Sequence, residues 1–250
     1  MVTPAARAAT RDRIAVACRR LALSPQVVTA CETTATPTQE AFLLQVLEAE
    51  VAHRDTLRRT RLVSRAGFPV PKSLTDYDRH RVTLPSTLTW GDLESGAYEA
   101  AHRNVVLYGP VGTGKTHLAI ALGLQACERG RAVHFYTVTD LVLRLSDARR
   151  TGTLDRLLQE IHRTDLLILD EWGYVPVDKD GSQLLFRIVA DSYETRSLIL
   201  TTNLEFSKWG GIFTDDQMAA AMIDRLAHHG YLLLFQGESY RMAHALMKER

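Results

Sequence analysis

The most restrictive feature of this sequence is an eight-residue segment, residues 109–116, which reads Gly-Pro-Val-Gly-Thr-Gly-Lys-Thr. It matches G-x-x-x-x-G-K-[ST], the pattern of a loop whose backbone N–H groups surround the phosphates of a nucleotide. Such a loop needs sharp backbone turns that a side chain would block, and it has three glycines to make them: Gly109, Gly112 and Gly114. With Gly at about 7% of residues in average proteins, a chance match in a chain of this length has odds of roughly one in a hundred.

The residues around this loop predict a strand before it and a helix after it. Residues 104–108 form a short apolar run, and residues 116–127 are typical of a helix. A loop placed this way favours anions, because the N–H groups and the dipole of a helix N-terminus attract negative charge. Lys115 would contact the β- and γ-phosphates, and Thr116 would offer its hydroxyl to Mg²⁺. The residues predicted to bind the nucleotide are Gly109, Pro110, Val111, Gly112, Thr113, Gly114, Lys115, Thr116 and His117.

A second segment, residues 165–171, contains four apolar residues followed by two acids, Asp170 and Glu171. The apolar run predicts a buried parallel strand, and ligands of open α/β sheets bind at the carboxyl ends of such strands. We expect Asp170 to bind Mg²⁺ together with Thr116, and Glu171 to act as the general base for an attacking water. By itself this pattern fits an acidic turn equally well, but the phosphate loop favours the nucleotide interpretation.

A third apolar run, residues 197–201, is followed by Thr202 and Asn203. We expect this strand to lie between the phosphate loop and the acidic strand, with the Asn203 amide near the γ-phosphate or its water. The alternative is a simple strand end, because Asn is common in turns.

Length and composition predict a globular protein with one large domain, or a core domain and a small one. Of the 250 residues, 46% are hydrophobic and 24% charged. The apolar runs are far shorter than the ~20 residues of a membrane-spanning helix, and no signal peptide is evident. Three scattered cysteines, Cys18, Cys31 and Cys127, fit a reducing, cytoplasmic location without disulfides or a metal site.

Positive charge is concentrated in the first third of the chain. Residues 1–81 hold 13 Lys and Arg against 8 Asp and Glu, a net charge of +5, whereas residues 82–250 hold 17 against 21, a net charge of −4. This asymmetry suggests that the basic part meets a polyanion. Four arginines of a predicted helix share one face and are the candidate DNA contacts, although a solvated face fits them equally well: Arg54, Arg58, Arg61 and Arg65. Arg79 and Arg81 are weaker candidates.

The chain is predicted to contain a helical N-terminal domain at residues 1–66, a linker at 67–90 and a nucleotide-binding domain at 91–250. Helices are expected at 5–22 and 38–66. In the second helix one apolar face is predicted, formed by Phe42, Leu43, Val46, Leu47 and Val51. Beyond residue 91, short strands alternate with helices, which predicts a parallel sheet covered by helices on both faces. The expected strands are 104–108, 132–137, 165–170, 197–202 and 231–235, and the last helix is expected near 239–249.

Five segments extend the likeness beyond a generic triphosphatase: residues 104–119, 170–174, 201–209, 224–229 and 237–241. They resemble the AAA+ ATPases, and within them the clade of the DnaC helicase loaders and the IstB transposition helpers of insertion sequences. The last two segments, and the run Arg65-Ala-Gly-Phe-Pro69 with Lys72, are closer to IstB. The resemblance covers about residues 38–245. It implies a P-loop domain with a central five-stranded parallel sheet, preceded by a small all-helical domain.

The resemblance also implies roles for individual residues. Lys115 and Thr116 match the Walker A pair, and Asp170 and Glu171 the Walker B pair. Asn203 matches the first sensor. Arg225 resembles the arginine finger that reaches the γ-phosphate of a neighbouring subunit, and Arg241 resembles the second sensor, although the tail after it is too short for a full helical lid. Without the resemblance, Arg225 also fits an ion pair on a helix face, and Arg241 a surface position.

The function that the resemblance implies is that of an ATP- and Mg²⁺-dependent helper of a transposase. Subunits would assemble head-to-tail on double-stranded DNA, and ATP hydrolysis would release them. Two alternatives stay open at this point. One is a replicative helicase loader that prefers single-stranded DNA, although the basic segment lacks the aromatic residues that stack on bases. The other is a DNA-free adaptor that keeps ATP only as a structural ligand.

Overall fold

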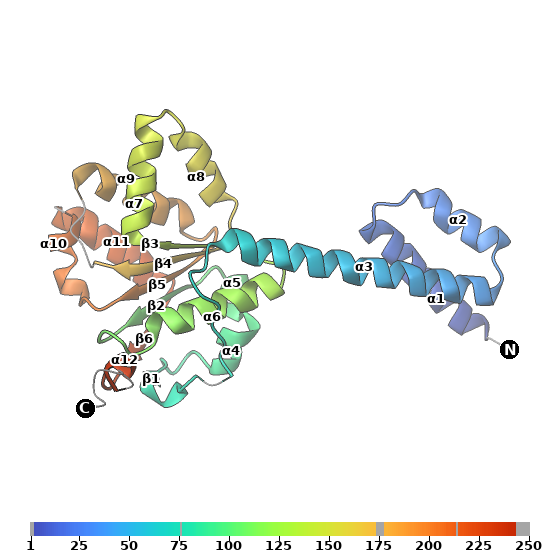
Figure 1. Cartoon of the computed structure of the whole chain (residues 1–250), viewed down its shortest axis with the longest axis horizontal. Coiled ribbons are helices and arrows are strands. Elements are labelled where there is room, and N and C mark those ends of the chain that lie inside the picture. The colour runs from blue at the N-terminus through green and yellow to red at the C-terminus, as the bar shows by residue number, and fades with distance from the viewer. Residues whose placement is uncertain (1–2, 76, 174–177, 214, 244–250) are drawn as a thin grey trace, which may run out of the picture. The chain divides into compact units, whose positions relative to one another are not determined.

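The computed structural model of the chain describes residues 3–75, 77–173, 178–213 and 215–243 (Figure 1). The chain divides into two compact units, Met1–Arg61 and Leu62–Arg250. The sequence pattern predicts a helical domain at residues 1–66, a linker at 67–90 and a nucleotide-binding domain at 91–250, and these finer boundaries stay predictions. Among the described residues, no helix is both long enough and apolar enough to cross a membrane.

The first unit is built from helices. They are α1 (Pro4–Arg20), α2 (Pro25–Thr34) and most of α3 (Pro37–Ala66), which continues into the second unit. The pattern did not predict α2, although its start has a recognisable signal. The Ser24 side chain accepts a hydrogen bond from the Gln26 N–H, and Pro25 occupies the first turn, where its missing N–H is harmless.

The predicted apolar face of α3 is partly wrong. Phe42 is 68% exposed and Val46 47% exposed, whereas Leu44 and Leu47 are buried in the core of the first unit. The helix has apolar residues on both sides, and a buried acid decides which side faces inward. Glu40 is fully buried, where it accepts hydrogen bonds from two arginines of α1. The side of α3 that carries Glu40 is therefore the one that packs against α1.

The second unit contains a six-stranded sheet, in the order β1-β6-β2-β5-β4-β3. Its strands are β1 (Val82–Thr83), β2 (Asn104–Tyr108), β3 (Val133–Thr137), β4 (Leu166–Trp172), β5 (Ser197–Thr202) and β6 (Gly230–Phe235). The last five are mutually parallel, which confirms the predicted five-stranded parallel sheet. The additional strand, β1, pairs antiparallel with β6 and lies within the predicted linker. A strand of two residues is too short to produce a recognisable alternation.

Helices cover both faces of this sheet (Figure 1). One face carries α4 (Trp90–Ser95), α5 (Ala97–Ala100) and α6 (Lys115–Glu128). The other carries α7 (Val138–Arg150), α8 (Leu154–His162), α9 (Lys179–Ser192), α10 (Gly210–Phe213) and α11 (Asp216–His228). Two short 3₁₀ turns, Arg79–Arg81 and Phe206–Lys208, and the short helix α12 (Tyr240–Ala243) complete the described elements. The predicted last helix near 239–249 continues beyond the described residues.

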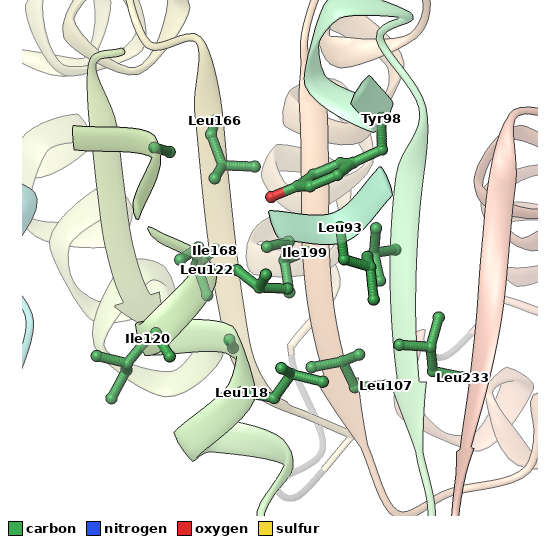
Figure 2. Packing of buried hydrophobic residues seen from close by; sticks show 14 of the residues in the cluster. Leu93, Tyr98, Leu107, Leu118, Ile120, Leu122, Leu166, Ile168, Ile199 and Leu233 are labelled. Carbon is green, nitrogen blue, oxygen red and sulfur yellow. The ribbon is translucent and has the colours of Figure 1, made fainter. Parts of the chain in front are cut away.

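Strand β4 shows how the sheet supports both cores. Leu166 and Ile168 pack with α6, as Figure 2 shows, whereas Leu167 and Leu169 pack on the opposite face. All four residues are fully buried. Because side chains alternate along a strand, a strand covered on both faces must be apolar throughout. Because helices cover both faces, a ligand can approach the sheet at the carboxyl ends of its parallel strands.

Candidate active site

The phosphate loop leaves the carboxyl end of β2 and enters α6, as the sequence pattern predicts. Its glycines have positive φ angles, 152° at Gly109, 79° at Gly112 and 97° at Gly114. A Cβ atom at Gly109 would lie 2.4 Å from the Phe235 carbonyl oxygen, and one at Gly112 would lie 2.1 Å from the Ser239 hydroxyl oxygen. Phe235 and Ser239 therefore lie too close to the loop for a residue with a side chain at position 109 or 112.

Lys115 is buried in this loop, and no carboxylate of the described residues is in hydrogen-bond contact with it. Its Nζ donates to the carbonyl oxygens of Gly109, at 2.7 Å, and Pro110, at 2.6 Å. Burial lowers the pKa of Lys115 from 10.5 to about 8, against the opposing effect of Asp170, while the positive charge of Arg241 lowers it further. A buried ammonium ion with neutral partners attracts an anionic ligand, because a phosphate would restore the charged form.

Asp170 and Thr116 lie next to each other, although 54 positions separate them in the sequence. The Thr116 hydroxyl donates to the Asp170 carboxylate, with 2.9 Å to Oδ1 and 3.1 Å to Oδ2. Both are oxygen donors, which Mg²⁺ prefers, and Mg²⁺ sites commonly use one or two protein groups and complete the shell with phosphates and water. Among the described residues, no group of three or more His, Cys, Asp or Glu could hold a metal alone. The pair therefore fits an ion that arrives with a nucleotide.

Glu171 and Asn203 follow at the same edge of the sheet. Glu171 is exposed and has a φ of 62°, in the left-handed region that non-glycine residues rarely adopt. Asn203 is exposed directly after β5, and β5 lies between β2 and β4. The predicted order of the three strands is therefore confirmed, and the catalytic roles of these two residues stay predictions.

Three of these residues, Thr116, Asp170 and Glu171, line a cavity of about 440 Å³. Its lining also includes Arg241, residues of β3 and α7 and residues of the segment that follows α3: His134, Tyr136, Asp140, Arg144, Gly67 and Pro69. Arg241 also lowers the pKa of Lys115, which places its charge near the loop. A cavity lined by both acids and arginines suits a metal–phosphate ligand.

Part of the predicted linker contributes to this site, which the sequence pattern did not reveal. Tyr77 donates a hydrogen bond to the Gly114 carbonyl oxygen at 3.3 Å, and burial raises its pKa well above the ordinary value of 10. The Tyr77 ring lies beside His117, with 5.2 Å between ring centroids, and His117 Nε2 lies 2.7 Å from the Ser73 carbonyl oxygen. No motif or periodicity marks Tyr77, so only the folded chain brings it to the loop.

Arg225 lies away from this cavity in the same chain. It is on α11, where its guanidinium donates to the Ala221 carbonyl oxygen at 2.8 Å and lies over the Phe186 ring, 5.1 Å from the centroid. The four candidate DNA-contact arginines, Arg54, Arg58, Arg61 and Arg65, are all exposed on α3. Arg54 is bonded to Glu50, and Arg65 lines the 440 Å³ cavity.

A parallel sheet with a phosphate loop after one strand and an acid pair at the end of another defines a P-loop nucleotide-binding protein of the AAA+ type. A family model described as "IstB-like ATP binding protein" matches residues 17–247. The chain therefore belongs to the IstB-like ATP-binding protein family.

Relatives in two organisms illustrate the family. A Pseudomonas aeruginosa protein described as an ATP-binding protein of the insertion sequence IS21 is 37% identical over 201 residues, 80% of this chain and 76% of the relative. A Geobacillus stearothermophilus protein, described as an ATP-binding protein of the insertion sequence IS5376, is 34% identical over 208 residues, 83% of each chain.

Solved structures support the fold alone. The DnaC helicase loader matches with a TM-score of 0.50 and 21% identity, over 55% of this chain and 81% of that chain. DnaA from Aquifex aeolicus, bound to AMPPCP, matches with a TM-score of 0.51 and 25% identity, over 59% of this chain but only 45% of that chain.

Proposed function

We propose that this protein is an ATPase that assembles on double-stranded DNA and assists the transposase of an insertion sequence. The observation that carries the enzymatic part is the cavity that Asp170 and Glu171 line together with Thr116 of the phosphate-loop motif. The biological part rests on the family and on relatives described as proteins of insertion sequences.

The residues divide the work of ATP hydrolysis among them. Lys115 would bind the β- and γ-phosphates, exchanging its present carbonyl partners for phosphate oxygens. The Thr116 oxygen keeps lone pairs free while its proton is donated to Asp170, so the two residues would hold Mg²⁺ together. When bound, Mg²⁺ neutralises charge on the phosphates. Glu171 would take a proton from the attacking water, and Asn203 would orient that water.

Assembly would complete the site. Arg225 lies outside the 440 Å³ cavity of its own chain, as expected for a residue that acts on a neighbour. An arginine delivered from a second subunit stabilises charge on the transferring phosphoryl group and couples hydrolysis to assembly. Such a contact joins two different surfaces, so it propagates head-to-tail into a ring or a helix.

DNA contact is assigned to the basic side of α3. Arg54, Arg58, Arg61 and Arg65 are spaced to fall on one side of the helix, and exposed arginines bind phosphates without reading sequence. Arg79 and Arg81 are the weaker candidates. Arg79 pairs with Glu94 at 2.6 Å and Arg81 with Asp78 at 2.9 Å, as Arg54 of the favoured set pairs with Glu50 at 2.7 Å.

Light scattering and fluorescence anisotropy test this proposal directly. The purified full chain is mixed with labelled duplex or single-stranded DNA at fixed salt, with ATP and Mg²⁺ or with ADP. We expect large assemblies on duplex with ATP that are lost with ADP and with the Lys115→Ala variant. A preference for single strands would favour a helicase loader instead, and absence of DNA binding with either nucleotide would favour an adaptor.

A further inference from the structure

We propose that Thr201 is a positioning residue that holds both acids of the site in their working geometry. The inference rests on the proposed ATP hydrolysis and adds a residue that no sequence motif assigned to it. Thr201 lies near the carboxyl end of β5 and is 2% exposed. It would act only through Asp170 and Glu171.

The Thr201 hydroxyl joins the two acids by hydrogen bonds of opposite sense. It donates to Asp170 Oδ1 at 2.6 Å, and it accepts from the Glu171 backbone N–H at 3.0 Å. A hydroxyl has a single proton to donate, so this arrangement commits it to Asp170. One buried side chain thereby sets the carboxylate of the first acid and the backbone of the second.

The pairing of β4 with β5 explains why such a contact is needed. Leu169 pairs with Leu200 and Trp172 pairs with Thr202, so Asp170 and Glu171 together stand opposite Thr201. This is a β-bulge, in which an extra residue interrupts the ladder and loses its regular partner. The Thr201 hydroxyl replaces that partner for the Glu171 N–H.

The bulge changes where the second acid points. Consecutive residues of a regular strand point to opposite faces, yet Asp170 and Glu171 both line the 440 Å³ cavity. The 62° φ of Glu171 is a strained conformation that persists only where the surroundings hold it. Thr201 supplies that hold, since it bonds the Glu171 N–H directly.

Loss of the Thr201 hydroxyl should therefore affect hydrolysis more than ATP binding. Asp170 would keep its bond from Thr116, and Lys115 would be untouched, so the metal and phosphate contacts remain. The Glu171 N–H would lose its acceptor, and the bulge could relax toward a regular strand. A displacement of about 1 Å in a catalytic group can reduce the rate by roughly 100-fold.

The test is a Thr201→Val substitution in the full chain, with kcat and KM for ATP, the Kd of a fluorescent ATP analogue and the melting temperature all measured. We expect kcat to fall by about tenfold or more, within the range that a displacement of about 1 Å can cause, while the Kd changes by less than about threefold. Thr201→Ser keeps the hydroxyl and should restore most of kcat. If Thr201→Val does not fold, kcat and the Kd are compared in Thr201→Ala instead.

Thr164→Val is the matched control. The Thr164 hydroxyl is also buried and donates at 2.6 Å to the Ile161 carbonyl oxygen, but it lies just before β4, at the opposite end from the acids. This variant should lose stability and keep kcat. An unchanged kcat in Thr201→Val, an equal loss of kcat in the control, or a parallel loss of ATP binding would each overturn the inference. A wild-type chain that hydrolyses no ATP, with or without DNA, would instead refute the proposed function, and the inference with it.

Discussion

Each of the two units buries a charged side chain, and the partners of those charges differ. In the first unit, Glu40 receives hydrogen bonds from Arg7 and Arg11, so opposite charges within the fold satisfy it. In the second unit, Lys115 is bonded to two backbone carbonyl oxygens. The same contrast appears in their pKa values. Two arginines lower the pKa of Glu40 to about 2, which favours its charged form, whereas burial lowers that of Lys115 to about 8, which disfavours it.

This difference separates a structural charge from a binding charge. A buried ion whose partners are supplied by the chain contributes to the fold, and breaking such a pair is destabilising. A buried ion that lacks an opposite charge in contact weakens the fold unless a ligand supplies one. We therefore expect loss of the Glu40 charge to lower stability without changing ATP binding. Loss of the Lys115 charge should weaken ATP binding without lowering stability.

The largest expected effect belongs to Glu171, an exposed acid in the second unit. Glu171→Gln removes the base but keeps the size of the side chain, so ATP hydrolysis should fall by roughly 10²- to 10⁴-fold. ATP binding and the melting temperature should stay close to those of the wild type, and the ATP-bound assembly on DNA should persist. Phosphate release and light scattering measure these outcomes. Rapid hydrolysis by this variant would exclude Glu171 as the base.

Lys115→Ala tests the binding charge itself. We expect the Kd for ATP to rise by roughly 100-fold, because hydrogen bonds to a charged group are lost. The melting temperature without nucleotide should not fall, since Lys115 forms no ion pair with any residue that the structure describes. Calorimetry of ATP binding and of unfolding measures both quantities. A large loss of stability with ATP affinity retained would make Lys115 structural and remove the contrast with Glu40.

The pKa of Lys115 predicts how ATP affinity depends on pH. Its value in the nucleotide-free protein is about 8, and a bound phosphate favours the protonated form, so binding above this pH must take up a proton. The Kd should therefore be flat below the pKa and rise by up to about tenfold for each pH unit above it. Titrations between neutral and alkaline pH check this, with Lys115→Arg as a variant whose charge does not titrate there. A Kd that stays constant over this range contradicts the assignment.

The smallest change with pH near neutrality is expected for the stability of the first unit. At acid pH, however, the contribution of the Glu40 charge should be lost. The pKa of Glu40 is lowered from 4.5 to about 2 in the fold, so its contribution to stability is complete above 4.5 and is lost as the pH falls toward 2. Thermal unfolding of the full chain, followed by its helical circular-dichroism signal at pH values between these two pKa values, measures that loss. Glu40→Gln should abolish this pH dependence and leave ATP affinity unchanged, whereas Glu48→Gln, which breaks an exposed pair with Arg13, should alter neither. If stability depends on pH in the same way in the wild type and in Glu40→Gln, the Glu40 charge does not stabilise the first unit.

Much of the second unit was predictable because its signals are local. The phosphate loop, the acidic strand end and the strand before Asn203 each occupy a few consecutive residues, and the parallel sheet follows from alternating strands and helices. Helix α2 was missed, although a serine cap and a proline mark its start. Strand β1 was missed because its stability comes from pairing with β6, more than 140 positions away.

The inward face of α3 shows a different limit. Phe42 and Val46 belong to the predicted apolar face, yet they are exposed because Glu40 and its arginines set the orientation of the helix. Hydrophobic periodicity cannot anticipate this, since the buried acid is satisfied by residues about 30 positions earlier. The same holds for Tyr77 and Thr201, whose roles depend on contacts with Gly114 and with the two acids.

The sequence already predicts which groups belong to the site, because a phosphate loop, an acid pair and an amide are types of residue at fixed spacings. It also determined the class of sheet, since alternating strands and helices allow few topologies. How the two acids are aimed is set by contacts between distant parts of the chain. That aim depends on a bulge between β4 and β5 and on a hydroxyl 30 positions from Glu171. Hydrogen bonds between distant strands leave no local pattern, so the folded chain alone shows that Thr201 joins Asp170 to Glu171.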